Sequence, residues 1–228
     1  MSDDTGRPTC LGFIMDGNRR WAREQGLPTL EGHRRGFAVF KECVRWARDR
    51  GVEHLAFYAF STENWKRTED EVGYLMALMQ QALEGLIADT PEERARVRVI
   101  GQRDDLSPEL RERIETVERE TIDAPAPTVW VALSYGGRDE IVRAATAAIA
   151  RGDAIDEAAF AALLDTAELP DPDIIVRTGG ERRLSNFLTW RSVYSELYFT
   201  DTYWPEMTES DFDAILSWYA GRHRRFGA

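Results

Sequence analysis

Two kinds of hydrophobic pattern alternate along the chain and predict its secondary structure. Short continuous runs of apolar residues predict buried strands, and apolar residues that recur every three or four positions predict amphipathic helices. The predicted strands cover residues 10–15, 54–60, 97–101, 128–135, 173–178 and 194–199. Because strands and helices alternate, we expect an α/β protein with a mostly parallel central sheet flanked by helices.

The helical pattern is clearest in two stretches. Apolar residues recur at helical spacing from Phe37 to Ala47, and Gly51 follows as a stop signal, which places His33 just before this helix. Residues 71–88 carry apolar side chains on more than one stripe, which predicts a long helix that buries two faces. Further helices are expected to open at Ser107-Pro108, after Gly137 and at residue 208.

Length and composition bound the organisation of the chain. Its 228 residues, without an internal repeat or a low-complexity linker, predict a flexible N-terminus over residues 1–9 and a single domain over residues 10–228. Cys10 and Cys43 lie in apolar runs and are expected to be buried thiols. Neither a signal peptide nor an apolar run of about 20 residues is present, so we expect a cytoplasmic protein.

The formal net charge of -11 restricts the choice of partners. An acidic surface disfavours nucleic acids and anionic membranes, both of which attract basic proteins. Local clusters of arginine stand out against this background. The chain also contains seven Trp, seven Tyr and ten Phe, more than a minimal core needs, so some aromatic residues are expected to line an apolar cavity.

Four polar segments begin where predicted strands end, at Asp16, Ser61, Gly136 and Arg177. Ligands of parallel sheets bind at the carboxyl ends of the strands, so one ligand could contact all four segments. In the first segment an aspartate stands beside a glycine and two arginines, which could hold Mg²⁺ on a diphosphate. The alternative is an ordinary Asp-Gly turn with solvated arginines.

The other candidate residues also have two interpretations. Residues 177–187 contain three arginines near two glycines and a serine, which suits an anion, although a solvated basic loop is the alternative. Residues 60–67 could contact a ligand or could cap the next helix. Glu196, within an aromatic run, could be a metal ligand or half of a structural ion pair. His33 could donate to a phosphate or could have no special role.

In this order, the segments resemble the signature regions of the cis-prenyltransferases, the family of undecaprenyl diphosphate synthase. The resemblance extends from about Leu11 to Gly227. Its most specific stretches are IMDGNRRWA (14–22), FSTENW (60–65), YGGR (135–138), RTGGE (177–181) and SNF (185–187), and the ending RRFG (224–227) also fits.

The resemblance implies that an allylic diphosphate reacts with isopentenyl diphosphate to give a Z-prenyl diphosphate and free diphosphate. It also implies a homodimer with a hydrophobic tunnel, Mg²⁺ as the cofactor, and at most peripheral membrane contact through a lipid product. Asp16 and Asn64 match catalytic residues, and Asp16 and Glu196 match metal ligands. An amide is no base, so Asn64 is expected to position groups or to join a proton relay. The matching substrate-binding residues are Gly17, Asn18, Arg19, Arg20, Trp21, His33, Ser61, Thr62, Glu63, Trp65, Arg67, Arg177, Arg183, Leu184 and Ser185.

Three departures from the family pattern concern the substrate pocket. Thr29 stands where the family usually has an arginine that contacts the allylic diphosphate. Its absence removes a charge-assisted contact of about 1.5–3 kcal/mol unless Arg34 or Arg35 compensates. Ser134 stands where an asparagine usually precedes Tyr-Gly-Gly, and Trp130 is a bulky residue in a strand that walls the tunnel in the family.

These departures leave the substrate pair open. The first hypothesis is a chain-elongating cis-prenyltransferase. The second is head-to-middle coupling of two allylic diphosphates, as in lavandulyl-type synthases. A non-catalytic partner subunit ranks last, because the residues that such partners lose are present. Product length depends on which of Tyr74, Met76, Met79 and Trp130 point into the tunnel, and spacing does not show this.

Overall fold

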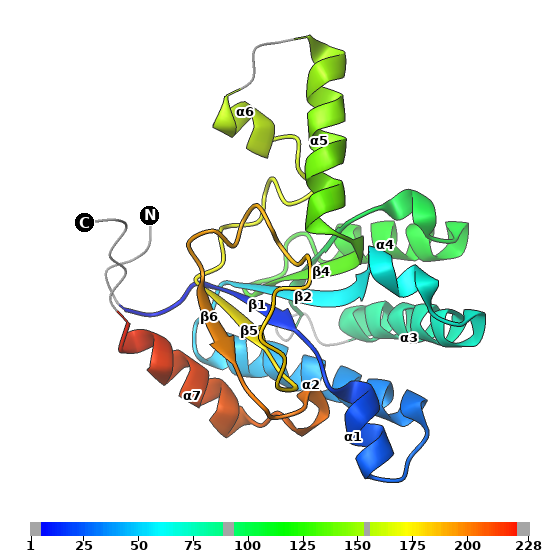
Figure 1. Cartoon of the computed structure of the whole chain (residues 1–228), viewed down its shortest axis with the longest axis vertical. Coiled ribbons are helices and arrows are strands. Elements are labelled where there is room, and N and C mark those ends of the chain that lie inside the picture. Colours follow the sequence, from blue (N-terminus) through cyan, green and yellow to red (C-terminus); the bar gives the residue numbers. More distant parts are fainter. Residues whose placement is uncertain (1–5, 89–93, 153–155, 223–228) are drawn as a thin grey trace.

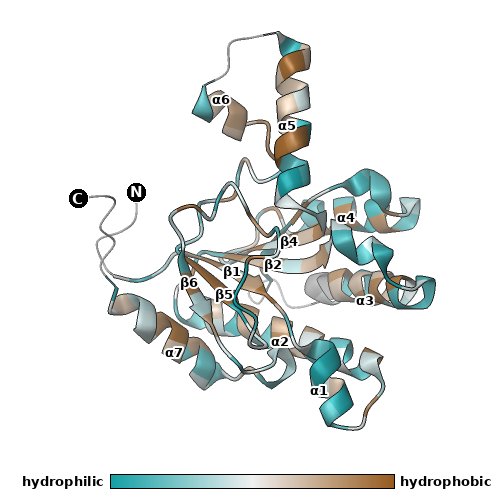
Figure 2. Cartoon of the chain, viewed as in Figure 1, coloured by the Kyte–Doolittle hydropathy of each residue, from teal (hydrophilic) through white to brown (hydrophobic). Residues whose placement is uncertain are grey.

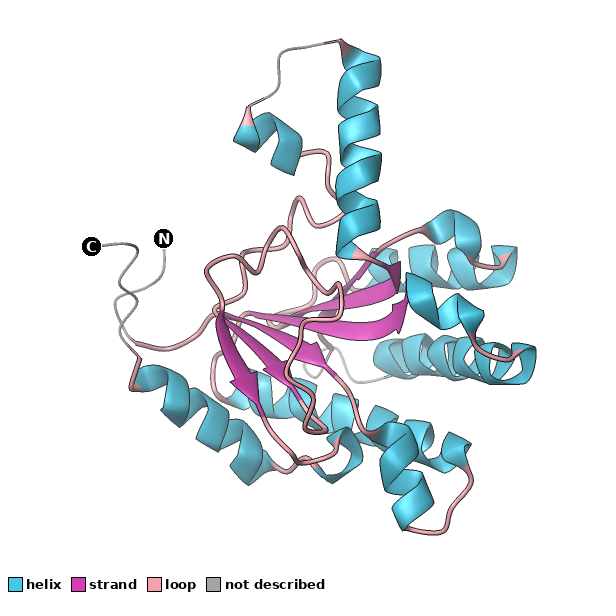
Figure 3. Ribbon diagram, in the orientation of Figure 1, coloured by secondary structure: helices cyan, strands magenta, loops and turns pink. Residues whose placement is uncertain are grey.

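The computed structural model of the chain describes residues 6–88, 94–152 and 156–222. Its centre is a six-stranded sheet with the strand order β3-β4-β2-β1-β5-β6, and every neighbouring pair is parallel (Figures 1 and 3). The strands are β1 (Cys10–Ile14), β2 (His54–Ser61), β3 (Arg96–Ile100), β4 (Thr128–Tyr135), β5 (Ile174–Arg177) and β6 (Glu196–Phe199). The predicted α/β fold with a parallel sheet is confirmed.

The helices agree with the hydrophobic pattern except near the N-terminus and over residues 157–161, where a short helix was not predicted. They are α1 (Asn18–Glu24), α2 (Thr29–Asp49), α3 (Glu69–Ala88), α4 (Pro108–Glu120), α5 (Gly137–Arg151), α6 (Glu157–Ala161) and α7 (Glu209–Ala220), with 3-10 turns η1 (Thr62–Lys66), η2 (Arg103–Asp105) and η3 (Trp204–Glu206). The short, polar α1 was not predicted. The placement of His33 before the first long helix was wrong, because α2 already begins at Thr29.

The early start of α2 follows from its close packing on α1. A side chain at Gly32 would meet the backbone oxygen of Asn18 at 2.1 Å, and one at Gly36 would meet the Asn18 side chain at 2.3 Å. These glycines let the two helices approach each other, and they also interrupt the apolar periodicity by which the start of α2 could have been predicted.

The two faces of the sheet are covered differently. One face packs against α2, α3, α4 and α7, whereas the other contacts loop residues that include Leu169, Phe187 and Leu188. Figure 2 shows the apolar colour concentrated on the strands and on the inward sides of these helices. Neighbouring residues of a strand point to opposite faces, so Val131 joins the first layer and Trp130 the second.

At the amino edge of the sheet, Asp173 joins β1, β5 and α7. Its carboxylate accepts hydrogen bonds from the backbone amides of Thr9 at 2.7 Å and Cys10 at 3.0 Å, and from the Tyr219 hydroxyl at 3.2 Å. Thr9, at the end of the segment expected to be flexible, is therefore anchored. Residues 1–5 of that segment and the family-like ending 224–227 lie outside the described residues.

We predict that Asp173→Ala lowers the free energy of unfolding by about 3 kcal/mol, because the amides of Thr9 and Cys10 lose their acceptor. Tyr219→Phe removes the hydroxyl that donates to Asp173 and should cost about 1 kcal/mol. Urea denaturation monitored by circular dichroism measures both. Equal losses in the two variants would contradict the role given to the carboxylate.

Candidate active site

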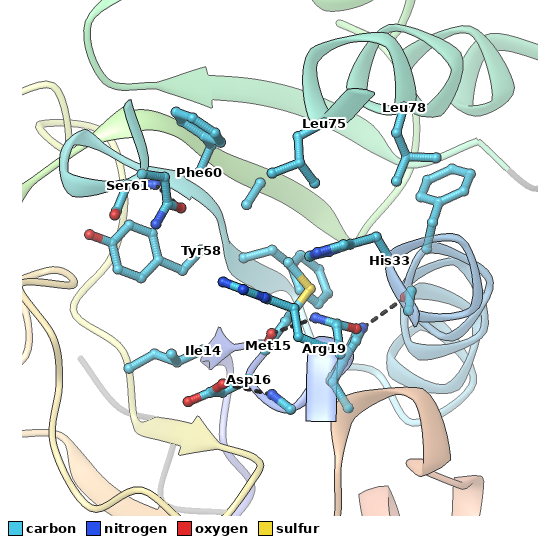
Figure 4. A pocket seen from close by; sticks show the side chains of 18 of the residues that line it. Ile14, Met15, Asp16, Arg19, His33, Tyr58, Phe60, Ser61, Leu75 and Leu78 are labelled. Atoms are coloured by element: carbon cyan, nitrogen blue, oxygen red, sulfur yellow. Dashed lines mark hydrogen bonds between the residues drawn. The ribbon is translucent and has the colours of Figure 1, made fainter. Parts of the chain in front are cut away.

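A cavity of about 1270 Å³ opens at the carboxyl ends of β1, β2 and β5 and extends between the sheet, α2 and α3 (Figure 4). Its mouth is polar and includes Asp16, Arg20, Ser61 and Arg177. The apolar side chains deeper in the cavity are Phe37, Phe40, Phe57, Leu75, Leu78, Met79, Ala82, Leu83 and Val131. A charged mouth and an apolar interior suit a ligand with an anionic head and a hydrocarbon tail.

Asp16, directly after β1, is the most connected carboxylate at the mouth. One of its oxygens accepts from Arg177 Nη2 at 2.8 Å, and the other accepts from the Gly17 amide at 2.7 Å and lies 3.2 Å from Arg20 Nη2. Burial alone would raise the pKa of Asp16, but these hydrogen bonds and positive charges outweigh it and lower the pKa below its usual value. Asp16 is therefore ionised at neutral pH.

Arg177, the last residue of β5, ties the two basic segments together. It pairs in register with Ile14 of β1, which brings its side chain beside Asp16. Its guanidinium is only 4% exposed and also donates to Ser185 Oγ and to the Arg183 carbonyl, both at 2.6 Å. The segments that begin at Asp16, Ser61 and Arg177 meet at the cavity as expected, whereas the segment that begins at Gly136 does not line it.

Gly17 supplies the backbone conformation that turns β1 into α1. Its φ of 101° lies in the left-handed region, and an added side chain would meet the Tyr203 ring at 2.5 Å. The turn places Asn18, Arg19 and Arg20 at the cavity mouth. Asn18 Nδ2 donates to the Met15 carbonyl at 2.9 Å, while its buried Oδ1 has no hydrogen-bond partner in the part of the chain that the structure describes.

His33 lies on α2 and faces the same cavity (Figure 4). Burial, with help from the positive charges of Arg67 and Arg19, lowers its pKa to about 4, and the charge of Glu71 opposes this shift only in part. Its buried Nε2 has no hydrogen-bond partner among the described residues. A neutral imidazole with a free ring nitrogen is therefore available to a ligand.

The η1 segment closes the mouth on the side of β2. The Ser61 amide donates to Asn64 Oδ1 at 3.1 Å, which fixes the Asn64 side chain. Glu63 accepts from Asn186 Nδ2 at 3.0 Å, so η1 is linked to the loop that follows β5. Arg67 pairs with Glu71 at 2.9 Å. All four η1-side residues Ser61, Glu63, Asn64 and Arg67 line the cavity.

Most predicted site residues line this one cavity: Asp16, Gly17, Asn18, Arg19, Arg20, His33, Ser61, Glu63, Asn64, Arg67, Arg177 and Ser185. Trp21, Thr62, Trp65, Arg183, Leu184 and Glu196 are not among its lining residues. The Arg183 guanidinium pairs with Glu181 at 2.5 Å, and only its backbone carbonyl reaches Arg177. The Trp65 ring stacks edge-on against Phe60, with ring centroids 4.9 Å apart.

Glu196 does not lie beside Asp16. It is the first residue of β6 and pairs with Ile174 at the amino end of β5, whereas Asp16 follows the carboxyl end of β1. Its carboxylate faces Arg222 at 3.7 Å. Asp16 and Glu196 of one chain therefore lie at opposite ends of the strands and are not placed to share a metal ion. The hydrophobic pattern alone did not show which end of the strand Glu196 occupies.

Of the residues that depart from the family pattern, Thr29 lies at the cavity and Trp130 does not. Thr29 lines the cavity, but Arg34 and Arg35 do not, and Arg34 is paired with Glu31 at 2.7 Å. Neither Arg34 nor Arg35 therefore replaces the missing arginine at the cavity. Of the four residues whose direction the spacing left open, Met79 lines the cavity and Tyr74, Met76 and Trp130 do not. Trp130 packs on the other face of the sheet.

Arg23, Tyr58 and Asn186 line the cavity as well, although they were not predicted to do so. Arg23 lies three residues after Arg20 on α1, so a prediction of this helix would have identified it. Asn186 stands in the SNF stretch and joins Glu63 to the amide of Arg138. Tyr58 belongs to the apolar run over residues 54–60, and its hydroxyl was the only sign that it could face a polar site.

We predict that stability falls more steeply with acid in the wild type than in a His33→Asn variant. The unfolded chain binds a proton at His33 near pH 6.5, but the folded chain binds it only near pH 4. This contribution is present above pH 6.5 and is lost progressively toward pH 4, by about 3 kcal/mol. Parallel curves of unfolding free energy against pH would contradict the buried neutral imidazole.

Comparisons with known proteins identify the family of the chain. The family model described as "Putative undecaprenyl diphosphate synthase" matches residues 14–227. An isoprenyl transferase of Agrobacterium fabrum is 45% identical, with 97% of this chain and 92% of the relative covered. An isoprenyl transferase of Thermotoga maritima is 41% identical, with 96% and 97% covered.

Two solved structures share the fold over nearly the whole chain. Lavandulyl diphosphate synthase from Lavandula x intermedia, in complex with dimethylallyl diphosphate, has a TM-score of 0.91 and 32% identity, covering 99% of this chain and 100% of that one. A probable undecaprenyl diphosphate synthase from Campylobacter jejuni has a TM-score of 0.83 and 33% identity, covering 97% and 99%. The chain therefore belongs to the undecaprenyl diphosphate synthase family of prenyltransferases.

Proposed function

We propose that this enzyme condenses an allylic diphosphate with isopentenyl diphosphate, giving a Z-prenyl diphosphate and free diphosphate. The observation that carries the proposal is the Asp16–Arg177 pair, 2.8 Å apart, at the mouth of a large apolar cavity. The mouth can hold the diphosphate groups, while the cavity shields a growing hydrocarbon chain from water. The match to the undecaprenyl diphosphate synthase family and the similarity to isoprenyl transferases support elongation over the alternative.

The two diphosphates would occupy the two basic segments of the mouth. The allylic diphosphate would contact Arg19, Arg20 and the neutral His33, beside the turn at Gly17 and Asn18. Isopentenyl diphosphate would contact Arg177 and Ser185, whose 2.6 Å hydrogen bond already aligns them. Arginine suits both positions, because its planar donors match phosphate oxygens in pairs.

Asp16 fits a Mg²⁺ ligand. Its pKa is lowered, so it presents an ionised hard oxygen donor. No group of three or more His, Cys, Asp or Glu side chains within the described ranges could hold a metal by itself. Phosphate oxygens would therefore complete the coordination, as is usual for Mg²⁺. When bound, the ion supplies positive charge that stabilises the leaving diphosphate.

In the reaction, the bond between C1 and the diphosphate oxygen of the allylic substrate breaks, and the double bond of isopentenyl diphosphate forms a new carbon–carbon bond at C1. A proton then leaves the isopentenyl unit as the new double bond forms. Asn64 lies at the mouth with its Oδ1 held by the Ser61 amide at 3.1 Å. It therefore orients reacting groups or a proton relay, since an amide is no base.

The same proposal covers assembly and location. The protein would act as a cytoplasmic homodimer that contacts membranes at most peripherally, through its lipid product. In the part of the chain that the structure describes, no helix is long and apolar enough to cross a membrane. A metal contact by Glu196 would require a second copy of the chain, because Glu196 lies at the opposite end of the strands from Asp16.

Head-to-middle coupling of two allylic diphosphates is the second candidate. Thr29 favours it, because the arginine expected at the allylic site is missing, and a lavandulyl diphosphate synthase shares the fold. To test both, the protein is incubated with Mg²⁺ and dimethylallyl, geranyl or farnesyl diphosphate, with and without isopentenyl diphosphate. Products are identified by mass and double-bond geometry. Products without isopentenyl diphosphate would support coupling, and no product in any mixture would contradict both functions.

Asp16→Ala is expected to reduce kcat by at least about 10³-fold, because the charge that holds the metal at the leaving group is lost. Asp49→Ala, which removes an exposed carboxylate at the end of α2, is the control and should keep full activity. Circular dichroism checks that both variants are folded. Near-normal turnover in Asp16→Ala would overturn the metal assignment.

Thr29→Arg should lower KM for the allylic diphosphate about tenfold, because a charge-assisted contact contributes about 1.5–3 kcal/mol. Arg34→Ala should leave this KM unchanged, since Arg34 pairs with Glu31 outside the cavity. Steady-state kinetics with a fixed concentration of isopentenyl diphosphate measure both effects. An increased KM in Arg34→Ala would show instead that Arg34 already fills the role.

A further inference from the structure

Ser134 has an unusual backbone conformation in the interior of the protein. It is fully buried near the end of β4, and its φ of 47° lies in the left-handed region that non-glycine residues seldom adopt. The Gln102 amide donates to its carbonyl at 3.0 Å, which holds this conformation. Strained residues that their surroundings hold in place cluster at functional sites.

The Ser134 hydroxyl connects the side chains of Trp65 and Asp105 by two hydrogen bonds. Trp65 Nε1 donates to Ser134 Oγ at 2.8 Å, and Ser134 Oγ donates to Asp105 Oδ2 at 2.6 Å. An indole can only donate and a carboxylate can only accept, whereas a hydroxyl does both. The result is a hydrogen-bonded chain from η1 through β4 to η2.

The hydrogen-bonded series Trp65–Ser134–Asp105 lies next to the active site and not within it. None of its three members lines the cavity, but Trp65 directly follows Asn64, and Glu63 and Ser61 on the same segment line the mouth. The Trp65 ring also packs edge-on against Phe60. The contacts of Trp65 with Ser134 and Phe60 therefore hold η1 on the side away from the cavity. Glu63 and Asn64 of the same segment line the cavity.

We propose that Asp105 and Ser134 are positioning residues that set the placement of η1, and of Asn64 in particular, through Trp65. The proposal rests on the prenyl transfer function proposed above. Asp105 reaches the catalytic segment only through Ser134. The diphosphate cradle formed by Asp16 and Arg177 belongs to β1 and β5 and is not attached to this chain. Loss of the chain should therefore slow turnover without weakening diphosphate binding.

The test compares Asp105→Ala with Asp104→Ala. Both residues are exposed carboxylates of η2, but Asp104 contacts only Arg111, at 3.8 Å, and takes no part in the chain. Steady-state kinetics use the allylic and isopentenyl diphosphates with Mg²⁺. We expect kcat to fall about tenfold in Asp105→Ala, with both KM values within about twofold of wild type, and no change in Asp104→Ala. Equal kcat in the two variants would overturn the proposal.

A double-mutant cycle separates positioning from a general loss of stability. Trp65→Phe keeps an aromatic ring against Phe60 but removes the indole N–H. If Asp105 acts through Trp65, then Asp105→Ala should cause no further loss of kcat in the Trp65→Phe background. Independent, multiplicative losses in the double variant would contradict the inference.

A spectroscopic measurement tests the chain without relying on activity. The indole N–H resonance of Trp65 is assigned by its absence in Trp65→Phe and should shift in Asp105→Ala but not in Asp104→Ala. An unchanged resonance would refute the hydrogen-bonded chain. A wild type that makes no product would refute the proposed function instead, so the two failures are distinguishable.

Discussion

The ion pair between Asp16 and Arg177 is the interaction on which the site depends. A guanidinium that is only 4% exposed needs a counter-charge, and a carboxylate at the end of a buried strand needs donors. The parallel register of β1 and β5 supplies both, because it sets Ile14 opposite Arg177 and so brings Asp16, two residues later, beside the arginine side chain. The segments that follow each strand then turn around this pair, through Gly17 on one side and Ser185 on the other.

The remaining features of the site divide between charge and shape. Arginines gather at the mouth of a chain whose net charge is -11, while His33 stays neutral because it is buried among them. Behind the mouth, α2 and α3 supply aromatic and aliphatic side chains that leave room for a hydrocarbon. The prediction that the helix at 71–88 buries two faces is explained by this arrangement, because α3 contributes both to the cavity wall and to the core.

The sequence predicted the strands, the parallel sheet and the convergence of polar segments, because buried strands are continuous apolar runs and the carboxyl ends of parallel strands share one edge. It could not predict contacts that depend on register or on side-chain direction. Glu196 lies at the amino end of β6, Trp130 points to the far face, and Trp65 binds Ser134 rather than lining the cavity. Gly32 and Gly36 interrupt the apolar spacing of α2, so its start at Thr29 and the position of His33 within it could not be predicted. Asp105 gave no signal, since an exposed carboxylate in a short turn resembles any other surface residue.

The central claim is that Asp16, paired with Arg177, forms the Mg²⁺-dependent diphosphate end of the site. It is tested most directly by calorimetric titration of an allylic thiodiphosphate, whose sulfur linkage slows reaction at C1, into wild type and Asp16→Asn with and without Mg²⁺. We predict tight binding to wild type with Mg²⁺ and an affinity at least about 100-fold weaker, or ~2.7 kcal/mol, when either the ion or the carboxylate is removed. Equal affinity in wild type and Asp16→Asn, or an affinity independent of Mg²⁺, would contradict the claim.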